Sequence, residues 1–352
     1  MSAWYRWLGY TVVVTLVAVA CSGDADTGGA DGDEQVTLTF VSFGGAYQEA
    51  QTKGWLEPFM AEHPNITIVQ EEPTDYAKLQ AMVESGNVTW DVVDVGNDFG
   101  LASDEDILEP IDCTLVPCDE LQPDVFQTTG YRVPDIIYSV VLAYRTDAFE
   151  GDAPTTFADF FDLETYPGKR SAWNFPSSGL LEMALIADGV APDQLYPLDL
   201  DRAFAKLDTI KDQIVWWDTG SQSAQLLADG ETVFGQSWNG RIFDIQQQDA
   251  PVETMWSQHL LTADFLVIPK GSQHVEEAQE LIAYATSAEN NAAVSQYIAY
   301  APPNENAVEN VDQSKEAELP TTHADTGVGF DDIWWDENFD MVDQLWQEWV
   351  QA

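Results

Sequence analysis

The sequence predicts an α/β protein made of two blocks, on three observations. Strand-like and helix-like segments alternate between residues 35 and 95, which is typical of a parallel sheet covered by helices on both faces. A similar alternation resumes after an apolar segment at 138–144. A length of 352 residues also favours two domains. No repeat of fixed period is visible, which argues against solenoids and propellers.

The first block starts with an alternating strand at 35–41, which ends before Gly44-Gly45. The next elements expected are a helix at 46–61, a strand at 66–69, a helix at 75–84 and a strand at 90–95. Ligands of such sheets bind at the carboxyl ends of the strands. Residues 43–47 and 96–99 therefore form one candidate site.

The second block follows the apolar segment 138–144, which has the character of a strand crossing between domains. Helical segments are expected at 157–161, 180–188, 201–210, 223–228 and 275–286, and strands at 232–236 and 265–269. The C-terminal stretch 333–350 is rich in Trp. We expect it to be a helix whose aromatic face packs on one block.

The N-terminus has the pattern of an export signal. An apolar run at 8–20 is shorter than the roughly 20 residues that cross a bilayer, so residues 1–20 are predicted to be a signal peptide. Cys21 follows directly and is expected to be lipidated. Ala18, however, stands where bacterial lipoprotein signals usually have Leu, so ordinary cleavage before an unmodified Cys21 stays open. Residues 21–35 are a predicted flexible tether, and either route places the protein outside the cytoplasm, at the periplasm or cell surface.

The other two cysteines fit an oxidising compartment. Cys113 and Cys118 enclose a short segment that a turn can close into a disulfide, which leaves Cys21 as the odd cysteine. A metal site is the alternative, but the four histidines are scattered and none is near this pair. We expect the disulfide, and neither a metal nor a cofactor.

The charge is extreme. Sixty-one Asp and Glu against 13 Lys and Arg give a formal net charge of −48, with the acids spread along the chain. Molar salt shortens the Debye length to about 3 Å and screens the repulsion, so a halophile's solubility surface is the expected explanation. The absence of a basic patch argues against nucleic-acid binding. A hydrophobic content of 45% excludes disorder of the body of the chain.

Several segments together resemble the extracellular solute-binding proteins of polyamine (spermidine/putrescine)-type ABC importers. They cover nearly all of 36–310 in order and lie at 41–47, 55–59, 90–94, 107–112, 166–170, 227–231, 237–241, 264–271 and 300–304. The resemblance implies a two-lobe periplasmic-binding-protein fold with crossing hinge strands, in which a cleft closes on a small molecule. It also implies a non-enzymatic, monomeric receptor that delivers its ligand to a membrane permease powered by a cytoplasmic ATPase. The expected lobes are 36–143 plus 265–302, and 144–264 plus 303–352.

The resemblance also implies a site for a small cationic amine. Asp264 matches the family's amine-binding aspartate, Trp238 a cleft tryptophan, and Tyr47 an aromatic position of the first lobe. Carboxylates suit ammonium groups, and Trp or Tyr adds cation–π contact. Two departures, Ser177-Ser178-Gly179 in place of an acid and Thr262 in place of a tryptophan, favour a smaller or less cationic ligand. A putrescine-like diamine, an amino-acid derivative and an opine stay open.

The remaining candidate ligand-binding residues are less specific: Phe43, Gly45, Asn97, Asp98, Ser178, Trp217, Thr219, Ser221 and Asn239. Thr219 or Ser221 can equally be the N-cap of a following helix. Asp264 can be one more surface acid, and Trp238 a core residue. Rival classes are an extracellular hydrolase, for which no Gly-x-Ser-x-Gly or His-Glu-x-x-His motif is present, and a ferric-ion binder, whose usual adjacent tyrosines are missing.

Overall fold

The computed structural model describes residues 35–122, 126 and 128–352. The predicted signal peptide, Cys21 and all but the last residue of the predicted tether lie outside these residues. The described strands form one sheet of nine strands in the order β2-β1-β3-β8-β4-β7-β5-β6, with β9 (Gly327–Gly329) paired to β8. Among the described residues, no helix is both long and apolar enough to cross a membrane.

One end of the sheet is parallel, as the alternation predicts. β1 (Val36–Val41) pairs in parallel with β2 (Ile66–Glu71) and with β3 (Val92–Val95). The single helix expected at 46–61 is instead α1 (Gly45–Gln51), a π-helical turn (Thr52–Leu56) and α2 (Glu57–Glu62). Pro58 lies in the first turn of α2 and has no N–H for an α-helical bond to the preceding turn, which favours the wider turn before it.

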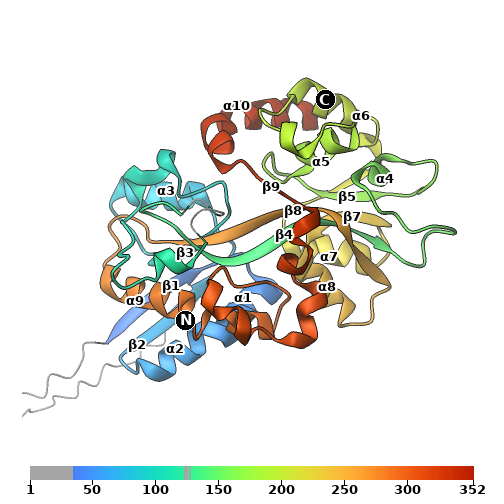
Figure 1. Ribbon diagram of the computed structural model, residues 1–352. Coiled ribbons are helices and arrows are strands. Elements are labelled where there is room, and N and C mark those ends of the chain that lie inside the picture. Colours follow the sequence, from blue (N-terminus) through green and yellow to red (C-terminus); the bar gives the residue numbers. More distant parts are fainter. Residues whose placement is uncertain (1–34, 123–125, 127) are drawn as a thin grey trace, which may run out of the picture. The chain divides into compact units, whose positions relative to one another are not determined.

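Two long strands cross the middle of the sheet. β4 (Val133–Arg145) and β8 (Val252–Val267) pair antiparallel along nearly their whole lengths. Figure 1 shows them running between the strands β1 to β3 and the strands β5 to β7. The expected strand at 138–144 is the second half of β4, and the strand expected at 265–269 begins inside the last part of β8.

The second group of strands is β5 (Arg170–Trp173), β6 (Ile214–Trp217) and β7 (Phe234–Trp238), all parallel within the group. Its helices α4 (Phe157–Phe161), α5 (Leu180–Ala187), α6 (Leu200–Asp208) and α7 (Gly220–Ala228) agree with the expected segments to within a few residues. A further helix, α8 (Asn239–Gln246), was not predicted. α3 (Tyr76–Ser85) belongs to the first group, and α9 (Val275–Thr286) follows β8.

The chain ends in α10 (Asp332–Gln351), as the Trp-rich stretch predicts. Trp335 and Trp346 are fully buried in the large core cluster that includes α5 and α6. Short 3-10 helices occupy the connections Ala102–Ile107, Cys118–Glu120, Pro192–Gln194, Lys211–Gln213, Asn291–Gln296, Glu305–Asn310, Gln313–Glu318 and Pro320–Thr326.

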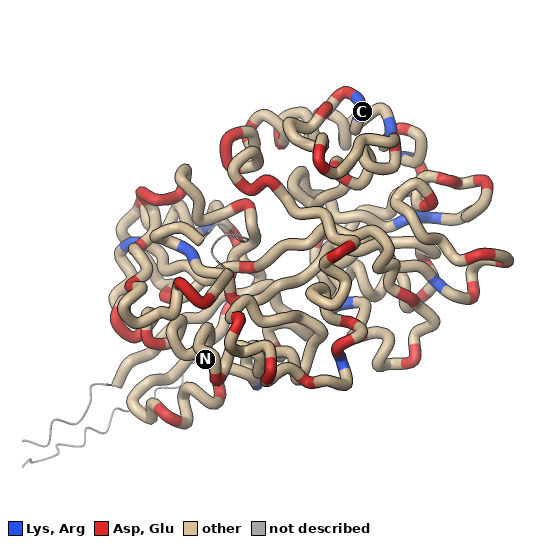
Figure 2. Tube along the Cα trace, in the orientation of Figure 1, with Lys and Arg blue, Asp and Glu red and all other residues tan. Residues whose placement is uncertain are grey.

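The predicted disulfide is present between Cys113 and Cys118, with an S–S distance of 2.06 Å. The described residues contain no group of three or more His, Cys, Asp or Glu side chains able to hold a metal ion. Figure 2 shows acidic residues over the whole described chain, with few basic ones between them. The acidic character is therefore spread over both strand groups.

Candidate ligand pocket

The carboxyl ends of the parallel strands surround one pocket, where the sequence places its candidate site. Phe43 follows β1, Asn97 and Asp98 follow β3, and Trp173 and Trp238 end β5 and β7. The complete lining is Phe43, Tyr47, Tyr76, Gly96, Asn97, Asp98, Tyr138, Val140, Trp173, Ser177, Ser178, Trp238, Arg241, Asp264, Tyr300 and Phe330. The lining is rich in aromatic side chains and has a few charged and polar groups, as is usual for small-molecule sites.

Asp264 supplies a buried carboxyl group to this pocket. It lies on β8 opposite Ile136 of β4 and is only 6% exposed. Burial raises the pKa of Asp264 well above its usual value, the charges of Asp94 and Asp135 raise it further, and a hydrogen bond from Tyr138 opposes the shift. No ion pair in the described part of the chain includes Asp264. A cation entering the pocket would stabilise this carboxylate.

Two more carboxyl groups lie behind the pocket wall. Asp94 accepts hydrogen bonds from Ser42 Oγ (2.8 Å) and Gln51 Nε2 (2.7 Å), and Asp135 accepts one from the Tyr47 hydroxyl (3.2 Å). Both acids are fully buried. Burial raises the pKa of Asp94 to about 7 and that of Asp135 well above its usual value. These groups fix Tyr47, whose ring lines the pocket.

Arg241 brings a positive charge to the same pocket. It lies in the first turn of α8, is 3% exposed, and donates from Nη2 to the Gly44 carbonyl at 2.9 Å. Its Nε and Nη1 are buried and have no hydrogen-bond partner among the described residues. A Cβ on Gly45 would lie 2.8 Å from Nη1, and one on Gly220 2.8 Å from Nε. Both glycines therefore leave space that the guanidinium needs.

Aromatic rings form the walls. Trp238 meets Trp173 and Trp217 edge-on, with ring centroids 5.2 and 5.3 Å apart. Tyr300 meets Tyr47 edge-on at 5.2 Å. The pKa of Tyr300 is raised mainly by burial; Arg241 lowers it and Asp264 raises it, so both charges act on one hydroxyl.

The structure brings together seven of the predicted ligand-binding residues: Phe43, Tyr47, Asn97, Asp98, Ser178, Trp238 and Asp264. The other five do not line the pocket. Trp217 packs behind Trp238, and Thr219 is the N-cap of α7. The Asn239 side chain accepts from Ser139 N and donates to the Ala299 carbonyl. Gly45 and Ser221 lie beside each other, next to Arg241.

Sequence reasoning missed Arg241, Tyr76, Tyr138, Trp173 and Tyr300 as pocket residues. A signal for Arg241 existed, because a basic residue is rare in this chain and Arg241 follows a strand end in the segment 237–241. Nothing in the sequence around Tyr138 on β4 or around Tyr300 indicates that these side chains line the pocket. Their approach depends on the pairing of distant segments.

Comparisons with known proteins show to which family the chain belongs. The family described as bacterial extracellular solute-binding protein matches residues 54–321. The gamma-aminobutyric acid (GABA)-binding protein of Pseudomonas aeruginosa is 31% identical, over 89% of this chain and 91% of that protein.

Two of the similar solved structures bear on the ligand. One, titled the Atu4243-GABA receptor, is 42% identical, covers 89% of this chain and 97% of its own, and has a TM-score of 0.82. The other is the periplasmic binding protein AgtB of A. tumefaciens R10 in complex with agropinic acid. It is 33% identical, covers 90% of this chain and 99% of its own, and has a TM-score of 0.82.

These similarities confirm the predicted fold class and the prediction of a non-enzymatic receptor, and they support a place outside the cytoplasm. The chain belongs to the bacterial extracellular solute-binding proteins, the ligand-capturing components of ABC importers.

Proposed function

We propose that this protein captures a small molecule with an ammonium group and a carboxylate at opposite ends, with GABA as the best candidate, and delivers it to an ABC permease. In this proposal, 36–143 plus 265–302 and 144–264 plus 303–352 are lobes that close on the ligand, and β4 and β8 are the hinge strands. Acylation of Cys21 stays a prediction.

One observation carries the ligand class: the buried carboxyl group of Asp264 and the buried guanidinium of Arg241, two of whose nitrogens have no hydrogen-bond partner among the described residues, line the same pocket. Arg241 Nε and Nη1 are donors in a planar group, the arrangement that suits a carboxylate. Asp264 is the acceptor for the ammonium group. A zwitterion satisfies both groups at once, each through charge-assisted hydrogen bonds of about 1.5–3 kcal/mol.

A polyamine fits this pocket less well. Its second ammonium group would leave Arg241 without an anion and would add a like charge. Asp98 is the second acid of the lining, and its two carboxylate oxygens each already accept one hydrogen bond, from the Tyr76 hydroxyl (3.1 Å) and from Ser177 Oγ (2.7 Å). An opine is the second candidate, since the AgtB structure similar to this chain holds agropinic acid.

Thermal shift in molar salt tests the proposal, because a ligand bound only by the native state raises the melting temperature. Putrescine, GABA and succinate share one carbon-chain length and differ only in their end groups, so they isolate the charge requirement. We expect GABA to raise the melting temperature most. A larger rise with putrescine, or none with any amino acid or opine, contradicts the proposed ligand class.

A further inference from the structure

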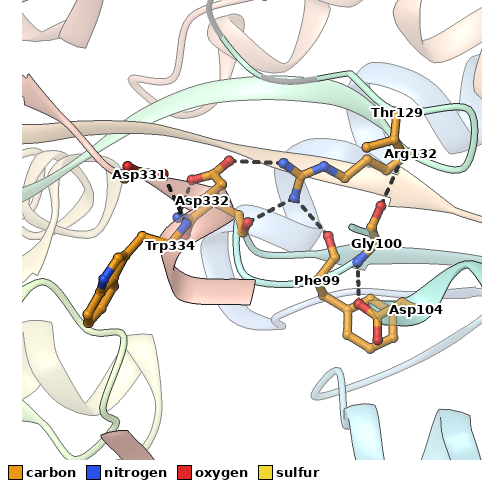
Figure 3. Close-up of polar contacts among 9 residues, drawn as sticks. Phe99, Gly100, Asp104, Thr129, Arg132, Asp331, Asp332 and Trp334 are labelled. Carbon is orange, nitrogen blue, oxygen red and sulfur yellow. Dashed lines mark hydrogen bonds and ion pairs between the residues drawn. The ribbon is translucent and has the colours of Figure 1, made fainter. Parts of the chain in front are cut away.

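The first turn of α10 joins the two strand groups beside the pocket. Asp332, its first residue, accepts from Arg132 Nη2 at 2.9 Å and from Asn97 Nδ2 at 2.8 Å. Figure 3 shows the Arg132 guanidinium between this carboxylate and the loop that contains Phe99. The Arg132 side chain is fully buried and that of Asp332 is 11% exposed, so this is a desolvated ion pair.

Each partner is held by its own side of the molecule. Arg132 Nη1 donates to the carbonyls of Asn97 and Phe99, both at 2.8 Å, and the guanidinium lies 3.8 Å from the Phe265 ring centroid. Arg132 therefore keeps these contacts if Asp332 leaves. The loop is braced further, because Gly100 N donates to Asp104 (Figure 3).

The body of α10 is fastened to the other strand group by three tryptophan indole groups. They donate from Trp335 to Glu182 (2.9 Å), from Trp346 to Asn174 (3.3 Å) and from Trp349 to Asp208 (2.7 Å). The boundary between the two proposed lobes therefore falls between Arg132 and Asp332. On the exposed side of the same boundary, Ser103 donates to Asp336.

Both sides of this boundary contribute to the pocket wall. Asn97 and Asp98 lie in the loop that Arg132 holds, and Phe330 precedes Asp332 by two residues. We propose that Asp332 is a positioning residue that latches α10 onto the loop after β3 when the pocket closes on its ligand, and so slows ligand release. This inference rests on the proposed closure of the lobes. The assignment of the ligand to Arg241 and Asp264 does not depend on it.

Asp332→Asn tests the latch, with Asp331→Asn as the matched control. Asp331 is the N-cap of α10 and accepts from Trp334 N at 3.0 Å (Figure 3). Asn is an equally good N-cap, so the control removes the same charge and keeps the helix start. With GABA as the probe, stopped-flow kinetics should show at least about tenfold faster dissociation for Asp332→Asn and little change in association, as expected when one partner of a buried charge pair is removed. Asp336→Ala should show a smaller effect of the same sign.

A ligand-free measurement keeps the two proposals separate. Without ligand, a latch that forms only on closure predicts similar melting temperatures for Asp332→Asn and Asp331→Asn. A much lower value for Asp332→Asn means that the ion pair is a permanent part of the fold. Dissociation as slow as in the parent protein means that Asp332 does not hold the pocket closed. Either result overturns the latch. Failure of the parent to bind GABA contradicts the proposed ligand alone.

Discussion

At the scale of residues, the pocket region concentrates negative charge. Asp94, Asp135 and Asp264 are buried and Asp98 is partly buried, while the pocket lining contains one guanidinium, that of Arg241. Burial of a carboxylate without a cation favours its protonated form. The unliganded site therefore retains protons that exposed carboxyl groups would lose, and it is ready for a ligand with a positive group.

Asp94 gives this argument a measurable pH dependence. Its pKa rises from 3.8 to about 7 in the folded protein, so the folded state holds a proton that the unfolded state releases. The stabilisation is fully present below the unfolded pKa and is lost as the pH rises toward 7. Asp94→Asn should make the decline in unfolding free energy between about pH 4 and pH 7 shallower, by up to about 1.4 kcal/mol per pH unit.

Chemical denaturation at several pH values provides the measurement, and Asp193→Asn, at an exposed position, is the control. An unchanged slope in Asp94→Asn would show that this carboxyl group does not hold the proton. Asp135, whose pKa is also raised, would then be the group to test.

Part of the pocket could be foreseen from single residues. Asp98, Phe43 and Trp238 follow or end predicted strands, and the carboxyl ends of parallel strands meet at one edge. Asp264 was placed by resemblance to a family. Arg241 was not predicted as a pocket residue. Its candidate role follows from the absence of a hydrogen-bond partner for Nε and Nη1 among the described residues, and this absence is visible only in the folded structure.

At the scale of elements, the short strands β1, β2, β3 and β7, each of which has a local sequence signal, were predicted to within a few residues. The long crossing strands β4 and β8 were predicted only in part. β4 begins at Val133, but Pro134 and Asp135 interrupt the apolar pattern, and a register shift occurs between Pro134 and Ile136. Residues 252–264 of β8 carry polar residues through half of their length. Their extended conformation comes from pairing with β4, a contact between segments more than 100 residues apart that no local window contains.

At the scale of the whole molecule, the net charge of −48 dominates. Lys and Arg side chains form only six ion pairs with acids among the described residues, so most of the described acids take part in none. Acidic positions far outnumber basic ones along the chain (Figure 2). Screening improves as the Debye length falls from about 10 Å at 0.1 M salt to about 3 Å at 1 M. The fold is therefore proposed to depend on high ionic strength.

The melting temperature should rise steeply as sodium chloride increases toward molar concentrations, and choline chloride should act similarly because screening depends on charge alone. Differential scanning calorimetry checks this. Equal stability in dilute buffer would show that local contacts already balance the acids.

The central claim is that one pocket binds a carboxylate through Arg241 and an ammonium group through Asp264. Isothermal titration calorimetry in molar salt, with GABA and putrescine as ligands, tests it on the parent protein, Arg241→Gln and Asp264→Asn. The control is Arg202→Gln, at an arginine 41% exposed in its side chain. Each pocket variant should weaken GABA binding by about 10- to 100-fold, and Arg241→Gln should not weaken putrescine binding. GABA binding by Arg241→Gln as tight as by the parent protein would contradict the account.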